Sequence, residues 1–247
     1  MKSLLVHDDS PMSRLLVAHL GDERVSVQPI AAASIDPASV QAWCAAVDAV
    51  TYVSTGWDEV AAERDSRWLD SLIAALAGTT NRLLYVSEHP WQADAERRLR
   101  DAAAQGLRSV IVRPTLVHGQ GTGQLLQRLL TYAEISGESV YVDDGASCTS
   151  TVHIDDVISL VRTALASSQD GSTYIAASDE VVTWRDVAVA VASTTRGPCR
   201  LRSVTVSEAA AAGLDAATMA MSTVVRDHSA VRRLGWSAVG PELLTDL

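Results

Sequence analysis

The stretch that decides the fold is Ser109–Gly121, which reads SVIVRPTLVHGQG. Its apolar start, Ser109–Arg113, predicts a buried strand, and Pro114 ends that strand because proline has no backbone N–H to donate. The alanine-rich and charged stretch Trp91–Gln105 before it predicts a helix. A helix that leads into a buried strand is the repeating unit of a parallel α/β sheet.

The same alternation extends outward from this stretch in both directions. Further strands are expected at Lys2–His7, Val25–Ile30, Ala49–Ser54, Arg82–Ser87, Ser139–Val142, Tyr174–Ala176 and Leu201–Val206. Further helices are expected at Ser10–Leu20, Asp36–Ala46, Asp65–Ala77, Gln124–Ser136, Thr183–Thr194 and Glu208–Met221, with one more opened by Asp155 and Asp156. We therefore expect an α/β fold in which residues 1–120 form the core and residues 121–247 add the remaining core elements and a C-terminal lobe, as a single structural unit.

The composition limits the classes of function. Of the 247 residues, 47% are hydrophobic, but no apolar run approaches the ~20 residues of a membrane span, so we expect a soluble protein. The first residues lack the apolar run of a secretory signal, which favours the cytoplasm. Cys44, Cys148 and Cys199 form no C-x-x-C pair, so we expect neither a disulfide framework nor a zinc site. A formal charge of −10 argues against nucleic acid and anionic membranes as partners.

Several motifs after Ala93 occur in a defined order. They are Arg113-Pro114-Thr115-Leu116-Val117-His118-Gly119-Gln120-Gly121, Val152-His153-Ile154-Asp155-Asp156-Val157, Gly171-Ser172-Thr173-Tyr174, Thr183-Trp184-Arg185-Asp186-Val187 and Arg233-Leu234-Gly235-Trp236. In these motifs the chain resembles the NAD-dependent epimerase/dehydratase branch of the extended short-chain dehydrogenase/reductase family, from about Asp48 to the end. The resemblance implies a Rossmann-like doubly wound parallel sheet with a small C-terminal α/β substrate lobe, and a helix-mediated homodimer would be ordinary for the family.

The first turn departs from this family. Where the family has G-x-x-G-x-x-G, this chain has His7, Ser10 and Ser13, and the carboxylates of Asp8 and Asp9 stand where phosphate would bind. Each carboxylate within ~5 Å of a pyrophosphate opposes binding by the order of 1 kcal/mol. We therefore expect no bound cofactor, unless NAD(P) binds in an atypical way.

The adenosine end departs as well. No acidic residue or arginine follows the strand that starts at Val25, so the ribose has no expected partner. The distance from Val25 to Asp48 is also short for a strand, helix, strand and helix. One β-α unit is therefore expected to be missing.

The catalytic centre is altered too. The family uses a serine or threonine together with a Tyr-x-x-x-Lys pair, in which the lysine lowers the pKa of the tyrosine. Ser87 keeps the first position, but Glu88 and Gln92 stand at the tyrosine and lysine positions. Since Lys2 is the only lysine in the chain, no shift of the alignment restores the pair.

The candidate site residues lie near the expected ends of strands, where open parallel sheets bind ligands. The catalytic candidates are Ser87, His118, Glu88 and His89, and the substrate-binding candidates are Trp57, Trp91, Gln92 and Thr115. Four of them have a structural alternative: Ser87 as a helix cap, Glu88 as a partner of a helix dipole, His118 as a filler of the volume of the family's tyrosine, and Trp57 as ordinary packing. His153, Asp155 and Asp156 are interpreted as structural, and no metal site is expected.

Three functions follow, and the sequence leaves them open. The first is cofactor-independent acid/base chemistry on a small organic metabolite, as an isomerase, cyclase, dehydratase or lyase, in bacterial specialised metabolism. The second is an atypical NAD(P)H-dependent ketoreductase without the Tyr/Lys pair. The third is a non-catalytic ligand sensor or partner-binding module. An enzyme is favoured over a sensor.

Overall fold

The computed structural model describes residues 2–7, 11–20, 25–29, 36–54, 59–87, 93–120 and 123–247. The chain folds as two compact units, each built from three segments. Unit 1 comprises Met1–Pro114, Ile158–Ile175 and Ser229–Trp236. Unit 2 comprises Thr115–Val157, Ala176–His228 and Ser237–Leu247. No helix among the described residues combines the length and apolar character that crossing a membrane requires.

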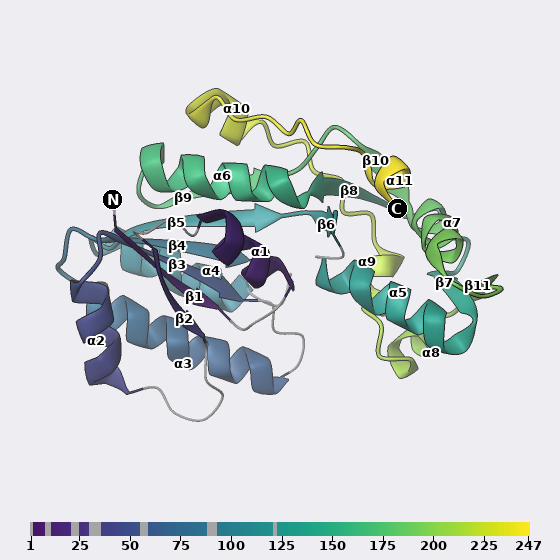
Figure 1. The fold of residues 1–247 in the computed structure, drawn as a ribbon, viewed down its shortest axis with the longest axis horizontal. Helices are drawn as coiled ribbons and strands as arrows, with labels where there is room; N and C mark the ends of the chain where they lie inside the picture. The colour runs from purple at the N-terminus through teal and green to yellow at the C-terminus, as the bar shows by residue number, and fades with distance from the viewer. Residues whose placement is uncertain are drawn as a thin grey trace. The chain divides into compact units, whose positions relative to one another are not determined.

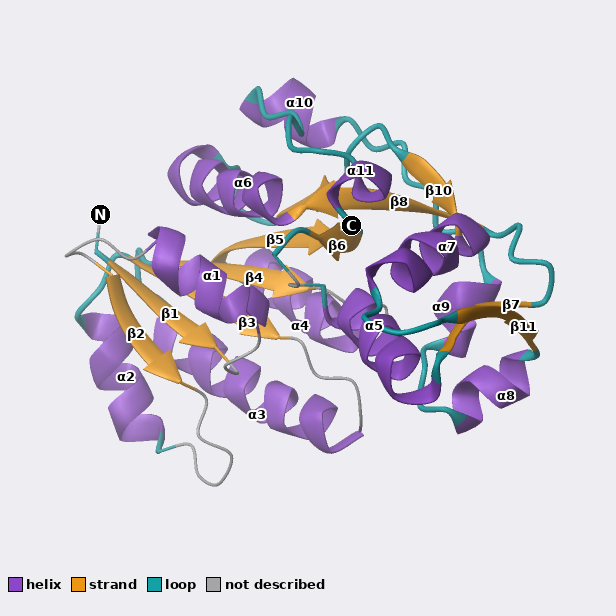
Figure 2. Ribbon diagram, turned by 45° about the vertical axis from the view of Figure 1, so that its right-hand side comes forward, coloured by secondary structure: helices purple, strands orange, loops and turns teal. Residues whose placement is uncertain are grey.

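Unit 1 contains a six-stranded sheet in the order β2-β1-β3-β4-β5-β9. Its strands are β1 (Ser3–His7), β2 (Val25–Pro29), β3 (Ala49–Ser54), β4 (Arg82–Ser87), β5 (Arg108–Pro114) and β9 (Ser172–Ala176). The pairs from β2 to β5 are all parallel. The predicted α/β class with a parallel central sheet is thus confirmed (Figure 2).

Among the described residues, the strand order agrees with the expectation that a β-α unit is missing. The usual order of a dinucleotide-binding sheet is 3-2-1-4-5-6, which places two strands beyond the first one on one side. Here β2 is the last strand on that side among the described residues. Between β2 and β3 the described residues contain one helix, α2 (Pro37–Ala45), in line with the short Val25–Asp48 segment.

Helices cover both faces of the sheet in unit 1. They are α1 (Pro11–Leu20), α2 (Pro37–Ala45), α3 (Glu59–Leu76), α4 (Ala93–Ala104) and the Ile158–Ser167 part of α6 (Ile154–Ser167), and α10 (Ser229–Leu234) also belongs to unit 1. Helices α2 and α3 lie on one side of the sheet and α6 on the other (Figure 1). Asp36 caps α2 as predicted, since its carboxylate accepts from the backbone N–H groups of Ala38 and Ser39.

The core of unit 1 follows from the alternation of side chains along each strand. Leu4, Val6, Val50, Tyr52 and Leu83 point to one face, where they pack with α2, α3 and α4. The intervening residues of these strands, such as Leu5 and Leu84, are equally buried. A sheet buried on both faces therefore reads in sequence as continuous apolar runs, which is why its strands could be predicted.

Unit 2 contains two small sheets and its own helices. Its strands are β6 (Leu116–His118), β7 (Glu138–Val142), β8 (Cys148–His153), β10 (Val181–Thr183) and β11 (Arg200–Val204). Its helices are α5 (Gln124–Ser136), α7 (Trp184–Thr194), α8 (Val206–Ala211), α9 (Ala216–Ala220) and α11 (Leu243–Asp246). The sheets have the orders β10-β8-β6 and β11-β7.

One predicted element of unit 2 is wrong. The alanine-rich stretch Glu208–Met221 is not one helix, because Gly213 adopts φ +73° and ends α8, and Asp215 then caps α9. Alanine favours a helix at each position, but a residue in the left-handed region stops the hydrogen-bond ladder.

Candidate functional site

Ser87 stands at the carboxyl end of β4, as predicted, and its side chain is fully buried. Its hydroxyl donates to Glu96 Oε1 at 2.8 Å. Glu96 lies in the first turn of α4, and its carboxylate is also held by Arg113 of the neighbouring strand β5 and by Arg100 one turn further along α4. Ser87 is therefore one of three donors that converge on a single buried carboxylate.

Glu96 stays ionised in this network. Burial raises the pKa of its carboxyl, but the hydrogen bonds from Arg113 and Ser87 outweigh burial, so that the net pKa lies below its ordinary value. Because the Ser87 hydroxyl proton is directed at this carboxylate, the oxygen of Ser87 can accept a hydrogen bond from a ligand but is poorly placed to donate one. A proton relay through Ser87 is thus disfavoured, and a positioning role fits better.

His118 is brought into a second cluster, which lies wholly within unit 2. It ends β6, and the parallel register of β6 and β8 places it opposite His153. The two imidazole rings meet edge to face with centroids 5.3 Å apart. His118 Nδ1 lies 3.0 Å from Asp246 Oδ2, and His153 Nε2 lies 3.9 Å from the same oxygen. Two histidines therefore share one carboxylate of α11.

The protonation state of His118 follows from this geometry. Burial lowers the pKa of the imidazole, and the hydrogen bond and charge of Asp246 oppose that effect only in part. The ring is therefore neutral near pH 7. Since a carboxylate accepts and cannot donate, Nδ1 carries the hydrogen, and Nε2 holds the basic lone pair.

The segment that carries Asp246 is fixed by two further carboxylates. Glu180 Oε2 accepts from the backbone N–H of Leu243 at 2.8 Å and also from the hydroxyl of Thr151. Asp156 accepts from the backbone N–H groups of Val239 and Gly240 at 3.0 and 2.9 Å. Asp156 thus anchors the segment before α11. His153, in turn, accepts from the N–H of Asp155 at the start of α6.

Gly119 is required by the close approach of His153. It has φ +91°, and a Cβ at this position would lie 2.3 Å from His153 Nε2. Both the backbone conformation and the contact exclude other residues. The glycine of the V-H-G segment therefore serves the pairing of the two histidines.

Thr115 has a structural position. Its backbone N–H and its hydroxyl both donate to the carbonyl of Ala176, at 3.0 and 3.1 Å. The other candidates, Trp57, Glu88, His89, Trp91 and Gln92, lie outside the described residues. Of the predicted residues, the structure therefore describes Ser87 in unit 1 and His118 and Thr115 in unit 2.

Sequence reasoning missed the partners that define both clusters. No motif or regular spacing in the sequence links Asp246 or Glu180 to the histidines. Asp246, for example, contacts His118 from 128 positions away. Glu96 does have a signal in the sequence, because it is an acidic residue on the face of α4 that also buries Leu99. An acid on the apolar face of a helix needs cationic partners.

Of the three positions where the family motif has glycine, the structure describes the side chain of one. Ser13, at the third glycine position of the family motif, is fully buried. Glycine at this position permits close packing of the first helix on its strand, and here a side chain takes that space. Asp8, Asp9 and Ser10 lie outside the described residues.

No family model matches the chain. An uncharacterized protein of Schizosaccharomyces pombe is 29% identical over 184 residues, which are 72% of this chain. The match spans only 61% of that relative's length.

Solved structures give a fuller comparison. A dTDP-glucose 4,6-dehydratase of Streptomyces venezuelae, solved with NAD and TYD, has a TM-score of 0.75 and 15% identity over 97% of this chain and 92% of its own. A UDP-glucuronic acid 4-epimerase of Bacillus cereus, solved with UDP-glucuronic acid and NAD, has a TM-score of 0.74 and 13% identity over 100% of this chain and 96% of its own. RMD of Pseudomonas aeruginosa, complexed with NADPH, has a TM-score of 0.69 and 17% identity over 100% of this chain and 96% of its own.

The chain has the fold of these enzymes. They are extended short-chain dehydrogenases/reductases, and the likeness spans both units of the chain. At these identities the short-chain dehydrogenase/reductase fold is shared, whereas the chemistry of each site has to be argued from its residues.

Proposed function

We propose that the chain is an enzyme on a short-chain dehydrogenase/reductase fold that performs cofactor-independent acid/base chemistry on a small organic metabolite. The reaction class is isomerisation, cyclisation, dehydration or lyase cleavage, since these need proton transfer and no hydride. The observation that carries the proposal is the neutral, buried His118 held through Nδ1 by Asp246.

This arrangement suits a general base. Nε2 of a neutral imidazole takes a proton from carbon or oxygen, and Asp246 then stabilises the imidazolium that forms. A positioned acid/base group contributes roughly 10²–10⁴-fold to a rate. His153, edge-on to the same ring, restricts its orientation.

Access to His118 forms part of the proposal. Its side chain is fully buried, whereas that of Asp246 is 24% exposed. Because Glu180 holds α11, and with it Asp246, in place, the substrate reaches Nε2 only when another segment that covers the ring shifts. Such movements of short segments also exclude water from the reacting groups.

Two features support chemistry without a nicotinamide cofactor. The glycine positions of the first turn hold His7, Ser10 and Ser13, and Ser13 is buried. The Tyr-x-x-x-Lys pair is absent, because the only lysine is Lys2. The chain therefore lacks the glycines with which the family binds its cofactor. It also lacks the Tyr/Lys pair with which the family transfers a proton during reduction.

The atypical ketoreductase is the second candidate. The observation that favours it is that the structural neighbours were solved with NAD or NADPH. Titration of the purified protein with NADH and NADPH, followed by nucleotide fluorescence and Tm, separates the two candidates. We expect no saturation up to roughly 100 µM, and saturation at micromolar concentration would establish the reductase in place of the present proposal.

Proton exchange tests the catalytic role directly. The protein is incubated in D₂O with a panel of small ketones, hydroxy acids and enones, and deuterium incorporation next to the carbonyl is followed by NMR. We expect catalysed exchange with at least one compound, and a loss of roughly 10²-fold or more in His118→Gln. His19→Gln, on the exposed surface of α1, is the matched control. Exchange that persists unchanged in His118→Gln would remove His118 from the mechanism, and binding without exchange would favour the ligand sensor.

A further inference from the structure

Arg113 and Arg100 share one carboxylate. Arg113 donates to Glu96 through Nε at 3.0 Å and through Nη2, so its guanidinium is held as a fork. Arg100 donates through Nη1 at 3.2 Å to the oxygen that also accepts from Arg113 Nη2. The side chains of Arg113 and Arg100 are 45% and 47% exposed, whereas that of Glu96 is 3% exposed. This trio has a net charge of +1, and its cationic parts face solvent.

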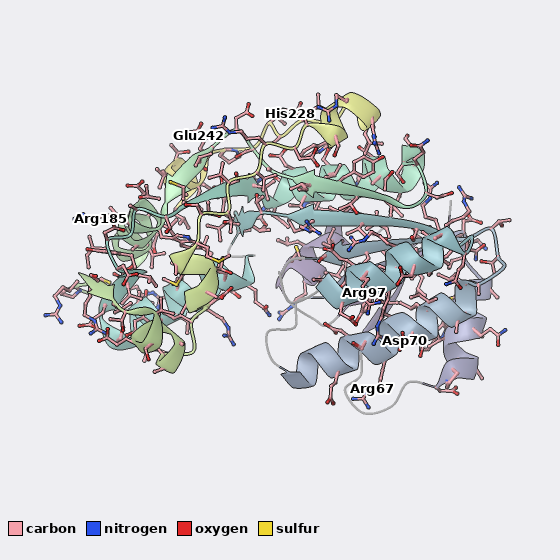
Figure 3. The ribbon with its side chains drawn as sticks, turned by 180° about the vertical axis from the view of Figure 1, so that it is seen from behind. Arg67, Asp70, Arg97, Arg185, His228 and Glu242 are labelled. Atoms are coloured by element: carbon pink, nitrogen blue, oxygen red, sulfur yellow. The ribbon has the colours of Figure 1, made fainter. Side chains whose placement is uncertain are left out.

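The neighbouring arginines of α4 have the opposite balance. Arg97 pairs with Asp94 and Asp101, and Arg98 pairs with Asp70 and Asp94. Arg97 and Asp70 lie on the adjacent helices α4 and α3 (Figure 3). Two guanidiniums there meet three carboxylates, so that this part of the helix surface is net negative. The net positive charge of this region therefore lies at Arg100 of α4 and Arg113 of β5, which share Glu96.

Arg113 lies where a ligand site of this fold is expected. Arg113 is the next-to-last residue of β5, and Ser87 is the last residue of β4. The register Val86↔Val112 places both at the carboxyl edge of the parallel sheet. In open α/β sheets, ligands bind beyond this edge.

We propose that Arg113 and Arg100 form a binding site for an oxyanion group, a carboxylate or a phosphate, of a small metabolite. The buried carboxylate of Glu96 fixes the guanidinium of Arg113, which lowers the entropy lost when an anion binds. Glu96 takes Nε and one Nη2 hydrogen of Arg113, so the Nη1–Nη2 edge is presented to the anion beside Arg100, and such an edge recognises carboxylates and phosphates bidentately. The inference goes beyond the proposed function, because it holds whether or not His118 transfers protons.

Calorimetric titration of the full chain with inorganic phosphate and with malonate tests the site and separates the two kinds of oxyanion. We expect saturable millimolar binding of at least one of them at low ionic strength. Arg100→Gln should weaken it about tenfold through loss of a charge-assisted contact, and Arg113→Lys should weaken it by a similar factor because the fork is lost while the charge stays. Arg97→Gln, from the acidic part of the same helix, should change the affinity less than twofold.

Two results overturn the inference. One is a wild-type protein that saturates with neither anion. The other is an equal loss of affinity in Arg97→Gln and Arg100→Gln, which would mean that the anions respond to general charge. The Tm of each variant is measured alongside, and Arg100→Gln keeps the inference testable if Arg113→Lys does not fold, because Arg113 still pairs with Glu96 in it. Neither result changes the outcome of the proton-exchange experiment on His118.

Discussion

His118 Nδ1 and Asp246 Oδ2 lie 3.0 Å apart although 128 residues separate them in the chain. We expect Asp246→Asn to lower the pKa of His118 further, because the charge that favours the imidazolium is removed. The measurement is the pH dependence of the His118 Cε1–H resonance. Asp155→Asn, whose carboxylate lies 3.6 Å from His153 Nδ1 and is 57% exposed, is the control and should leave this pKa nearly unchanged. A raised pKa in Asp246→Asn would contradict the assigned contact.

The depressed pKa of His118 predicts a stability loss in acid. The unfolded chain binds a proton at this residue below its ordinary pKa of 6.5, while the folded chain resists protonation because the ring is buried. Stability is therefore complete above about pH 6.5 and falls as the pH drops through the folded value. Denaturant unfolding between about pH 7.5 and 5 should show a steeper loss in the wild type than in His118→Gln. Parallel curves for the two proteins would rule the effect out.

Glu96→Gln should destabilise unit 1. The change leaves Arg113 without its ionic partner at a buried position, and we expect a loss of about 1–3 kcal/mol in the free energy of unfolding, reduced from the value for a fully buried pair because the arginine is half exposed. Because the pKa of Glu96 is lowered, its stabilisation is present above the ordinary value of 4.5 and is lost as the pH falls below it. Asp101→Asn on the exposed side of α4 should cost less than about 0.5 kcal/mol.

Gly119→Ala should disturb the paired histidines. A Cβ at φ +91° is strained and would lie 2.3 Å from His153 Nε2, so we expect a loss of more than about 1 kcal/mol and displaced imidazole resonances. Gly197→Ala, where a Cβ meets no atom within 4 Å, is the matched substitution and should be near neutral. Urea unfolding of both variants decides the comparison.

Leu72→Ala should be among the more damaging core changes. Leu72 is fully buried between α3 and the sheet, and its truncation should cost about 2–5 kcal/mol. Ile135→Ala at an 82% exposed position should stay within about 0.5 kcal/mol. A small effect at Leu72 would mean that the α3 face of the core is loosely packed.

The sequence predicted most of unit 1 because its strands are apolar on both faces and helices such as α2 have a local signal in Asp36, whereas the short helix α10 was not predicted. Strand β8, Cys148–His153, was missed, since its buried residues include Thr149, Ser150 and Thr151, and a polar strand shows no apolar alternation. Its hydroxyls are satisfied by partners such as Thr223, 74 residues away. Such pairings are set by the tertiary fold.

The candidate site was predictable only in its individual residues. Ser87 and His118 were found because motifs place them at strand ends, but their partners Glu96 and Asp246 come from elsewhere in the fold. The partners change the chemistry: Ser87 donates to Glu96 and can only accept from a ligand, and His118 is a neutral base with a fixed tautomer. Single-sequence reasoning therefore located the positions but not the protonation states.

Each unit is built from three separate segments of the chain, so a single cut cannot separate the two units. A fragment that ends at Pro114 lacks β9, the strand that pairs with β5, and most of α6. It would therefore expose the unpaired edge of β5 and an apolar face of the sheet. A fragment that begins at Thr115 would contain β9 and α6 without the sheet on which they pack. We therefore expect neither fragment to fold alone, and we expect a folded protein when the two fragments are co-expressed.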